Sequence, residues 1–530
     1  MEEQLAQAAL GQSGDSVLHA IDLVIIGIYV VGTLALGTFF GKYVKSAGDF
    51  FVASKALPFW AIGMSVVVSD IGATDFMTLS GAGYKYGIAA ANFDWMGSMP
   101  AMAFAAFIFI PYFWRAGVFT IPEFLGKRYN AGVQLIHASI WGVFLLVMLA
   151  VMLWLTAVML DSVLHIEGIG KEHYVWGIAV VAGIYTVSGG LAAVVMTDVV
   201  QLVVMFVGGA ALSILCLAEV GGWTHMTETI LAMPGHENHF TLLLPHDSET
   251  PYPWTGIVFG LGIVMATGYM AGNQAIVQRT LGARTEWDAK GGMLLAGFLK
   301  VFIPALVIIP GLAAVILIPD LKNGDDAAPM MIAKVLPPGL KGLMFAALFA
   351  ALMSSVDSTL NSATTIWTSD IYGKAFYYAK GKRPTEASLL VLGRICTVAF
   401  ILIGAYFSSF LAGKESMYTF VQTALAMFQG PVFAILLLGI MWKRANQWGA
   451  LAGLLLGVCF TTILYNSEGV FPSQDPFLFV AWWSFIFSMI VTAVVSLLTP
   501  PEPEEKIRGL VFGQVMQDGN MQRVLQERVE

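Results

Sequence analysis

Oxygen-bearing side chains gather in two short segments of an otherwise apolar sequence. In the first, Ser354, Asp357, Ser358 and Asn361 follow one another at intervals of three, one and three residues, which places them on one face of a helix. Hydroxyls and carboxylates are hard oxygen donors, which suit a hard cation rather than zinc or copper. Serine stripes also hold membrane helices together, but a carboxylate in the middle of this stripe favours a cation site.

The second segment, 69–72, reads Ser-Asp-Ile-Gly near the centre of an apolar stretch. Ser and Asp compete for backbone hydrogen bonds and Gly loosens a helix. A break here would direct carbonyl and amide groups into a cavity, the arrangement by which transporters bind solutes and coupling ions. A continuous helix whose Ser69 and Asp70 bond to neighbouring helices is the alternative, and this segment alone does not decide between the two.

The composition explains why these polar residues stand out. The chain has 530 residues, of which 57% are hydrophobic and 12% are charged. A soluble domain would carry about twice that share of charge. The net charge of -8 gives no basic surface for nucleic acid, and three widely spaced cysteines give no disulfide framework. The composition predicts a polytopic membrane protein in contact with a lipid bilayer.

Apolar segments of about twenty residues, long enough to cross a bilayer, recur along the chain. Thirteen are predicted, at 20–40, 57–82, 87–113, 135–163, 173–188, 191–217, 253–277, 287–318, 340–370, 388–411, 416–441, 448–466 and 476–498. If the N-terminus is outside, 20 of the 27 Lys and Arg, including Arg279, fall in cytoplasmic segments. We therefore expect an outer N-terminus, a cytoplasmic C-terminus and a location in the plasma (inner) membrane.

Ionisable residues inside such spans are costly and commonly functional. The candidates here are Asp70, Asp75, Asp94, Asp198, Lys300 and Asp357. The span 253–277 carries a second possible break at 267–269 (Thr-Gly-Tyr), and corresponding breaks in two halves indicate inverted repeats. We therefore expect an all-α fold of the LeuT type, with five plus five helices in inverted repeats and about 13 transmembrane helices in total.

This organisation divides the chain into seven parts. They are an extracellular N-terminus (1–19), a first extra helix and cytoplasmic loop (20–56), the first repeat (57–218), an extracellular loop (219–252), the second repeat (253–441), two additional helices (442–499) and a cytoplasmic tail (500–530). The extracellular loop holds four histidines. An ordinary polar loop is favoured over a metal site, because their spacing matches no familiar ligand frame.

Several stretches together resemble the solute:sodium symporter family, and within it the sodium/glucose branch that includes bacterial sodium/galactose symporters. The resemblance runs from about Asp49 to Arg444, and it is carried by Asp49–Ser65, Gly117–Arg128, Tyr185–Gln201, Asn273–Arg284 and Phe345–Thr365. It implies a sodium site made by the carbonyls of Val68, Ile71 and Ala351 and the hydroxyls of Ser354 and Ser355. Members that move two sodium ions have a further site, matched here by Ser69, Asp198, Ser355 and Ser358.

The acid Asp357 departs from that family pattern, because those members usually carry a hydroxyl or a small residue there. Its charge would either strengthen the second sodium site or let a proton replace sodium. The resemblance implies one or two sodium ions and no organic cofactor. Because Asp198 and Asp357 would repel each other near one water-filled path, we expect two cations per solute, at least one of them sodium.

The sugar-binding positions of the branch are partly kept. Lys300, Gln422 and the gating Tyr269 match, and Leu79, Phe93 and Tyr418 match the apolar and aromatic outer gate. Asp94 replaces a glutamate, Asp70 an asparagine, Asp75 a glutamine or histidine, and Ala266 an asparagine.

These patterns favour a symporter that couples inward sodium movement to uptake of a sugar or polyol. A cationic or zwitterionic amine or amino acid is the alternative solute, and a sodium-conducting channel or a sensor of the same fold is a further alternative. An enzyme is not expected, because the chain has no phosphate loop, H-E-x-x-H motif or nucleophile elbow with a triad.

Overall fold

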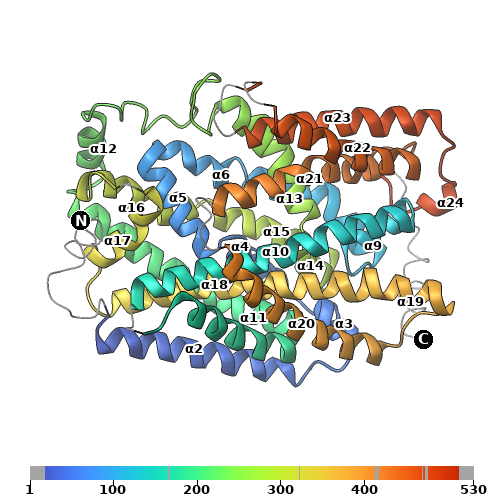
Figure 1. Ribbon diagram of the computed structural model, residues 1–530, viewed down its shortest axis with the longest axis horizontal. Helices are drawn as coiled ribbons and strands as arrows, with labels where there is room; N and C mark the ends of the chain where they lie inside the picture. Colours follow the sequence, from blue (N-terminus) through green and yellow to red (C-terminus); the bar gives the residue numbers. More distant parts are fainter. Residues whose placement is uncertain are drawn as a thin grey trace.

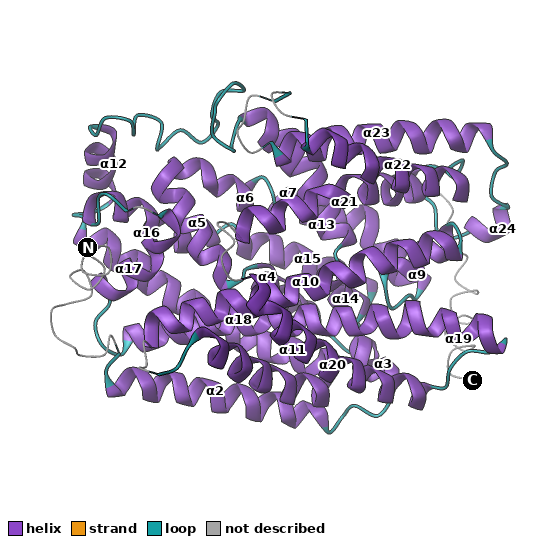
Figure 2. Ribbon diagram, viewed as in Figure 1, coloured by secondary structure: helices purple, strands orange, loops and turns teal. Residues whose placement is uncertain are grey.

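The computed structural model describes residues 18–164, 168–321, 323–411, 417–467, 470–471 and 476–512, and within these ranges the chain forms helices and no β-strand. Figure 2 shows the helices packed side by side, with most of the long ones running along the long axis of the molecule. Ten helices of the described ranges are long and apolar enough to cross a membrane, or 11 if one bent pair counts as a single span. The polytopic class is confirmed, whereas the predicted number of 13 is not.

The first predicted repeat mixes long helices with short pieces. In chain order it contains α4 (Phe59–Asp70), α5 (Ala73–Tyr86), η2 (Gly87–Ala91), α6 (Asn92–Trp95), α7 (Met99–Phe104), η3 (Ala105–Phe109), α8 (Ile110–Ala116), α9 (Ile121–Arg128), α10 (Ala131–Leu164) and α11 (Lys171–Glu219). The helix α4 has 12 residues, which is too short to cross a bilayer alone. Such short pieces explain why the number of spans differs from the number of apolar segments.

The second predicted repeat has the same mixed character. It contains η4 (Gly256–Ala266), α13 (Thr267–Gly272), α14 (Gln274–Leu281), α15 (Glu286–Lys300), α16 (Ile303–Leu317), η5 (Gly324–Asp326), α17 (Ala327–Val335), α18 (Leu340–Thr365), η6 (Ile366–Tyr372), α19 (Gly373–Lys380), α20 (Glu386–Ser408), η7 (Ser409–Leu411) and α21 (Met417–Met441).

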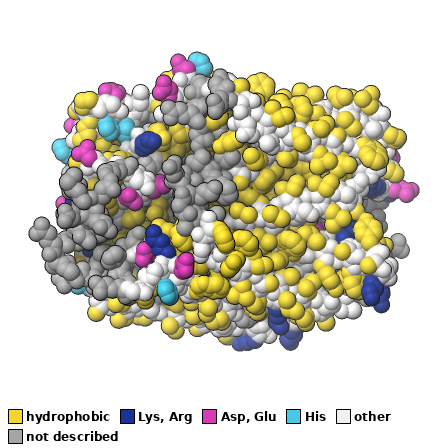
Figure 3. All heavy atoms as spheres, viewed as in Figure 1, with side chains coloured by type: hydrophobic (Ala, Val, Ile, Leu, Met, Phe, Trp, Pro, Cys, Tyr) yellow, Lys and Arg dark blue, Asp and Glu magenta, His cyan; other side chains and the backbone are white. Residues whose placement is uncertain are grey.

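The remaining described elements flank these two sets. They are α2 (Ala20–Gly41), α3 (Ala47–Val52), η1 (Ala53–Lys55), α12 (Trp223–Leu231), α22 (Gln447–Tyr465), α23 (Phe477–Leu498) and α24 (Glu504–Ile507). Figure 1 places α12, from the predicted outer loop, at one end of the molecule and α24, from the predicted tail, at the opposite end. Hydrophobic side chains cover the broad middle of the face drawn in Figure 3, as expected for a surface that meets lipid.

The first predicted break is confirmed, because α4 ends at Asp70 and α5 begins at Ala73. Ile71 and Gly72 between them have extended backbones, with ψ of 100° and 168°. The carboxylate of Asp75 accepts a hydrogen bond of 2.7 Å from the amide of Gly72. An acid in the first turn also complements the positive end of the helix dipole, so the local sequence stabilises the start of α5.

The second break lies a few residues beyond its predicted place. Thr267 to Gly272 are helical, and the chain turns at Asn273, where the helix axis bends by 52°. The side chain of Asn273 accepts from the amide of Ala275 at 2.8 Å, which caps the new helix. The expected break at 267–269 is therefore wrong in position. Gly268 is accommodated within the helix, and the chain changes direction where Asn273 caps the next helix.

The helix α18 forms the centre of the bundle. In the span that begins with it, 94% of the residues of an 18-residue apolar stretch are buried inside the protein. The helix packs against α4, α10 and α11. The long helix α11 covers two predicted spans and is interrupted at Gly190, whose φ of 52° is a left-handed conformation that glycine adopts readily. A Cβ atom at Gly190 would also lie 2.5 Å from the carbonyl oxygen of Phe50. The helix that carries the serine stripe is thus enclosed by α4, α10 and α11 of the first predicted repeat and by α14 and α20 of the second.

Candidate ion and solute site

The end of α4 meets the middle of α18 through neutral oxygen atoms. The hydroxyl of Ser354 lies 2.8 Å from the carbonyl oxygens of both Val68 and Ala351, and the hydroxyl of Ser355 donates to Ala351 at 3.0 Å. Ile71, at the break, lines the same cavity as Ser355. We call these five residues the cage. The oxygen atoms that the cage offers to an ion belong to carbonyls and hydroxyls. Such hard, uncharged ligands suit a hard cation.

A cavity of about 230 Å³ lies beside the cage. Most of its wall is apolar, from residues of α10, η4 and α21, while its polar side chains include ones from the first break, α6, α15 and α18. The wall includes the expected solute and gate residues whose side chains the structure describes, namely Asp70, Asp75, Leu79, Phe93, Asp94, Tyr269 and Lys300. Ala266 also lines it. The side chains of Gln422 and Tyr418 lie outside the part that the structure describes.

The polar end of this cavity is organised around Lys300. Its ammonium lies 2.5 Å from Asp70 Oδ2 and 2.8 Å from Asp94 Oδ1, and the three side chains are nearly buried. The second oxygen of Asp94 has no hydrogen-bond partner among the described residues. Asp75 contributes a third carboxylate to the cavity. The site thus holds three acids and one base, and it offers hydrogen-bond acceptors to a solute.

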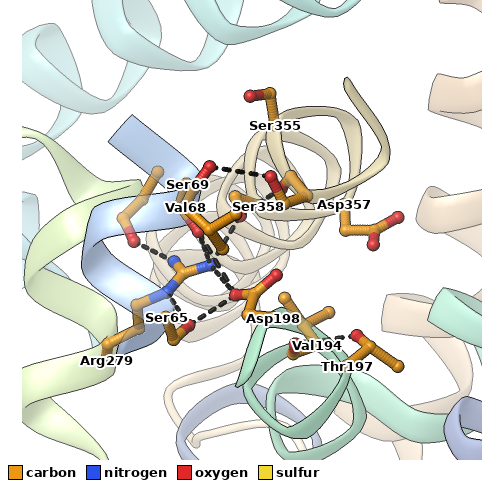
Figure 4. Close-up of polar contacts among 12 residues, drawn as sticks. Ser65, Val68, Ser69, Val194, Thr197, Asp198, Arg279, Ser355, Asp357 and Ser358 are labelled. Carbon is orange, nitrogen blue, oxygen red and sulfur yellow. Dashed lines mark hydrogen bonds and ion pairs between the residues drawn. The ribbon is translucent and has the colours of Figure 1, made fainter. Parts of the chain in front are cut away.

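A second polar cluster lies next to the cage, on the side of α18 that carries Ser358. The guanidinium of Arg279 forms a 3.0 Å ion pair with Asp198 and donates to the hydroxyls of Ser69 and Ser358 at 2.5 Å each and of Ser65 at 2.6 Å. We call these five residues the Asp198 cluster, and Figure 4 shows them converging from α4, α11, α14 and α18. Arg279 thereby pairs with one oxygen of Asp198, while the other oxygen, Oδ1, has no hydrogen-bond partner among the described residues.

The structure brings together only part of the set expected for a second sodium ion. Ser69, Asp198 and Ser358 meet in the Asp198 cluster, whereas Ser355 belongs to the cage. The side chain of Asp357 points away from Arg279 in Figure 4, and one of its oxygens accepts from Thr186 of α11 at 3.2 Å. Asp198 of α11 thus pairs with Arg279, whereas Asp357 of α18 accepts from Thr186.

Sequence reasoning missed Arg279, which was assigned to a cytoplasmic segment. That assignment is wrong, because Arg279 lies within α14 and its side chain is 1% exposed. A signal was present in the sequence, since the residue follows Asn273 by only six positions. A charge so close to a broken helix is as strong a candidate as Asp198 or Lys300.

Two of the four histidines of the outer loop, His236 and His239, contact each other. His239 bonds through its ring to the carbonyl of Tyr84 at 3.1 Å, and the ring of His236 lies 4.3 Å from it. Burial lowers the pKa of His239. No group of three or more potential metal ligands among His, Cys, Asp and Glu occurs in the described residues.

Comparisons with known proteins agree with this geometry. A family model described as the sodium:solute symporter family matches residues 50–457. A sodium/glucose cotransporter of Vibrio parahaemolyticus is 32% identical, over 91% of this chain and 91% of its own length. A sodium/myo-inositol cotransporter 2 of Oryctolagus cuniculus is 30% identical, over 93% of this chain and 78% of its own length.

A solved structure shares the fold. The substrate-bound, outward-open structure of a Na⁺-coupled sialic acid symporter superposes with a TM-score of 0.79 at 22% identity, covering 91% of this chain and 99% of that one. A likeness at this identity concerns the fold alone. It confirms the predicted all-α class of the LeuT type.

Proposed function

Because the chain belongs to the sodium:solute symporter family, we propose that its cavity carries a sugar or polyol into the cell together with sodium. Membership of the family makes the protein a sodium-coupled membrane transporter and not an enzyme. The sugar and inositol cotransporters among its relatives support the choice of solute, as do the acceptor-rich polar end and the apolar walls of the cavity.

The observation that carries this proposal is that the cage and the cavity share one segment of the chain, the first helix break. The first break lies in both, because Val68 provides a carbonyl to the cage while Asp70, Ile71 and Asp75 line the cavity at the break. An ion that holds this segment against Ser354 therefore also fixes the two acids that meet the solute. By linkage, the bound solute then strengthens ion binding by the same factor.

Three further residues have proposed roles at the mouth of the cavity. Leu79 and Phe93 form the apolar part of an outer gate, and the ring of Phe93 packs edge-on against Tyr252 at 5.7 Å. Tyr269 covers the solute from the second broken helix. Gln422 and Tyr418 are proposed as the α21 contributions to the solute site and the gate.

The direct test is uptake by purified protein in proteoliposomes. Labelled D-glucose and myo-inositol are offered with an inward sodium gradient and, as the control, with an equal potassium gradient. We expect accumulation only with sodium. Equal entry under both gradients would contradict coupling, and entry of ions without any solute would favour the channel alternative.

A cationic amine is the second candidate solute, favoured by the three carboxylates and one ammonium of the cavity. A cation would be attracted by the surplus of acids, whereas a neutral polyol needs only their oxygen acceptors. Competition separates the two. Unlabelled glucosamine and choline displace the labelled solute if the cavity selects for charge, and D-glucose or myo-inositol displaces it if the cavity selects for hydroxyls.

We also propose that the protein lies in the plasma (inner) membrane with the N-terminus outside and the C-terminus in the cytoplasm. The asymmetric distribution of Lys and Arg supports this orientation. A cysteine placed at the exposed His246 of the outer loop should react with an impermeant maleimide in intact cells, and one at Lys382 should not. The background is Cys459→Ser, because Cys459 is exposed.

A further inference from the structure

One threonine of α18, Thr359, faces the cavity with a hydroxyl that is poorly satisfied. It lines the cavity one helical turn beyond Ser355 and is 4% exposed. Its hydroxyl donates to Met152 Sδ of α10 at 3.4 Å, and Met152 lines the same cavity. A thioether sulfur is a weak acceptor, so a buried hydroxyl gains little from this contact.

Other hydroxyls of α18 bond to the backbone of their own helix. Ser355 donates to the carbonyl of Ala351 at 3.0 Å. Thr365 donates to the carbonyl of Asn361 at 2.7 Å. Bonding to a carbonyl one turn back is the common arrangement for a serine or threonine inside a helix. Because Thr359 donates to α10 instead, its hydroxyl is directed out of α18, at the boundary between α10 and the cavity.

Several other polar side chains of the cavity are hydrogen-bonded within the protein. The hydroxyls of Ser69 and Ser358 accept from the guanidinium of Arg279. The amide oxygen of Asn273 caps α14. A solute that bonds to these groups must compete with strong partners, whereas a solute that bonds to Thr359 displaces only a sulfur.

The contact between Thr359 and Met152 can be exchanged for a contact with a solute. A hydroxyl oxygen is a better acceptor than a thioether sulfur, and the unbranched methionine side chain adapts to a new neighbour. A solute hydroxyl at this wall therefore improves the bonding of Thr359 without leaving a buried polar group unsatisfied. A solute with a hydrogen atom in place of that hydroxyl gains nothing there.

We propose that Thr359 is a specificity-determining residue of the solute site, which hydrogen-bonds one hydroxyl of a solute that also meets Asp94 and Lys300. The inference rests on the proposed transport of a sugar or polyol. It narrows the solute to one whose hydroxyls reach both the ammonium of α15 and the wall of α18. It also places a solute contact one turn from Ser355 of the cage, on the same helix.

The test compares D-glucose with its monodeoxy analogues, each of which lacks one hydroxyl. The unlabelled analogues compete against labelled D-glucose in proteoliposomes under an inward sodium gradient. Each hydroxyl that the wild-type site binds should cost its analogue about tenfold in competition, roughly 1.4 kcal/mol. Thr359→Val keeps the shape of the side chain but loses the hydroxyl. It should abolish the penalty for one analogue, the one that lacks the hydroxyl facing α18, and keep the penalties for the others.

Three further variants separate recognition of the solute from a structural role. Thr359→Ser keeps a hydroxyl and should retain the wild-type pattern. Met152→Leu keeps apolar bulk without the sulfur and should retain it too. Thr462→Val is the matched control, because the exposed Thr462 of α22 bonds only to the carbonyl four residues back, at 2.9 Å. Binding of ²²Na⁺ without solute should change by less than about threefold in every variant.

A folded Thr359→Val protein that keeps the penalty for every analogue would overturn the inference. Loss of the same penalty in Met152→Leu would also overturn it, because the hydroxyl would then serve the sulfur and not the solute. If Thr359→Val does not fold, Thr359→Ala carries the same expectation.

The proposed solute fails separately from this inference. If the wild type takes up glucosamine but neither D-glucose nor myo-inositol, the proposed solute is wrong. Labelled glucosamine is then the probe, and the half-saturating concentration should rise about tenfold in Thr359→Val and stay unchanged in Thr359→Ser. Equal values in the two variants would overturn the inference, and uptake of none of the three solutes would refute both proposals.

Discussion

The cage and the Asp198 cluster lie within one turn of each other on α18, yet they balance charge in opposite ways. The cage has only carbonyl and hydroxyl oxygens, from Val68, Ala351, Ser354 and Ser355. The Asp198 cluster pairs a buried carboxylate with a buried guanidinium. The first consists of neutral oxygens that bond to one another, whereas the second holds a counter-charge for its acid and leaves Asp198 Oδ1 without a hydrogen-bond partner among the described residues.

This difference separates the tasks of transport from those of folding. A site of neutral oxygens releases its ion at a lower cost than a site with a full counter-charge, because a buried and fully paired charge is costly to separate. A site that keeps helices in register has no such restriction. Substitutions in the two clusters and in the cavity should therefore have different effects on stability, solute uptake and sodium binding.

Asp198→Asn should be the most damaging single substitution. It leaves the guanidinium of Arg279 buried without a counter-charge, and breaking one partner of such a pair costs about 3–5 kcal/mol in the free energy of unfolding. Denaturation in detergent measures the loss. The control is Asp247→Asn in the outer loop, where the side chain is 74% exposed and we expect a change within about 0.5 kcal/mol. An Asp198→Asn protein as stable as the wild type would show that the pair does not hold the helices together.

Lys300→Met should reduce solute uptake and leave sodium binding nearly unchanged. It leaves Asp70 and Asp94 facing each other without the ammonium that now lies 2.5 and 2.8 Å from them. We expect uptake of D-glucose or myo-inositol to fall by about 100-fold or more, roughly 2.7 kcal/mol. Binding of ²²Na⁺ to the neutral cage should change by less than about threefold. A parallel loss of both would mean that the cage depends on the charges of the cavity.

Ser355→Ala should weaken the binding of sodium. Removing one hydroxyl from a closely fitted oxygen set takes away a ligand that the enclosed space does not replace. The sodium concentration for half-maximal uptake should rise about tenfold, equivalent to roughly 1.4 kcal/mol. Ser467→Ala is the control, because the exposed Ser467 makes the same bond to the carbonyl four residues back. Unchanged sodium dependence in Ser355→Ala would remove the cage from the coupling mechanism.

Asp75→Asn should have the smallest effect if the solute is neutral. An amide oxygen can still accept from the Gly72 amide, which now lies 2.7 Å from the carboxylate. Uptake of a neutral sugar or polyol should therefore stay within about tenfold, a cost of roughly 1.4 kcal/mol or less. A cationic solute would instead lose most of its affinity. Strong loss of glucosamine uptake with little change for glucose would reverse our choice of solute.

The sequence by itself determined the membrane class, the first break and the polar stripe of α18. These features depend on composition, on residues a few positions apart and on backbone preference, all of which are local. Gly72 and Asp75 specify the start of α5 through one hydrogen bond, and the spacing of Ser354 and Ser358 fixes their common face in any helix. The family resemblance added the partners of these segments.

Only the tertiary structure decided which charges meet. Asp198 and Arg279 are 81 residues apart in the chain, and Lys300 is 230 residues from Asp70. Spacing in sequence carries no information about such pairs, and it did not show that Asp198 pairs with Arg279 while Asp357 accepts from Thr186. The packing of α14 against α4 and α18 brings Arg279 to the acid. Because a buried charge is tolerable only beside its counter-charge, that packing determines which acid is paired with a base of the chain.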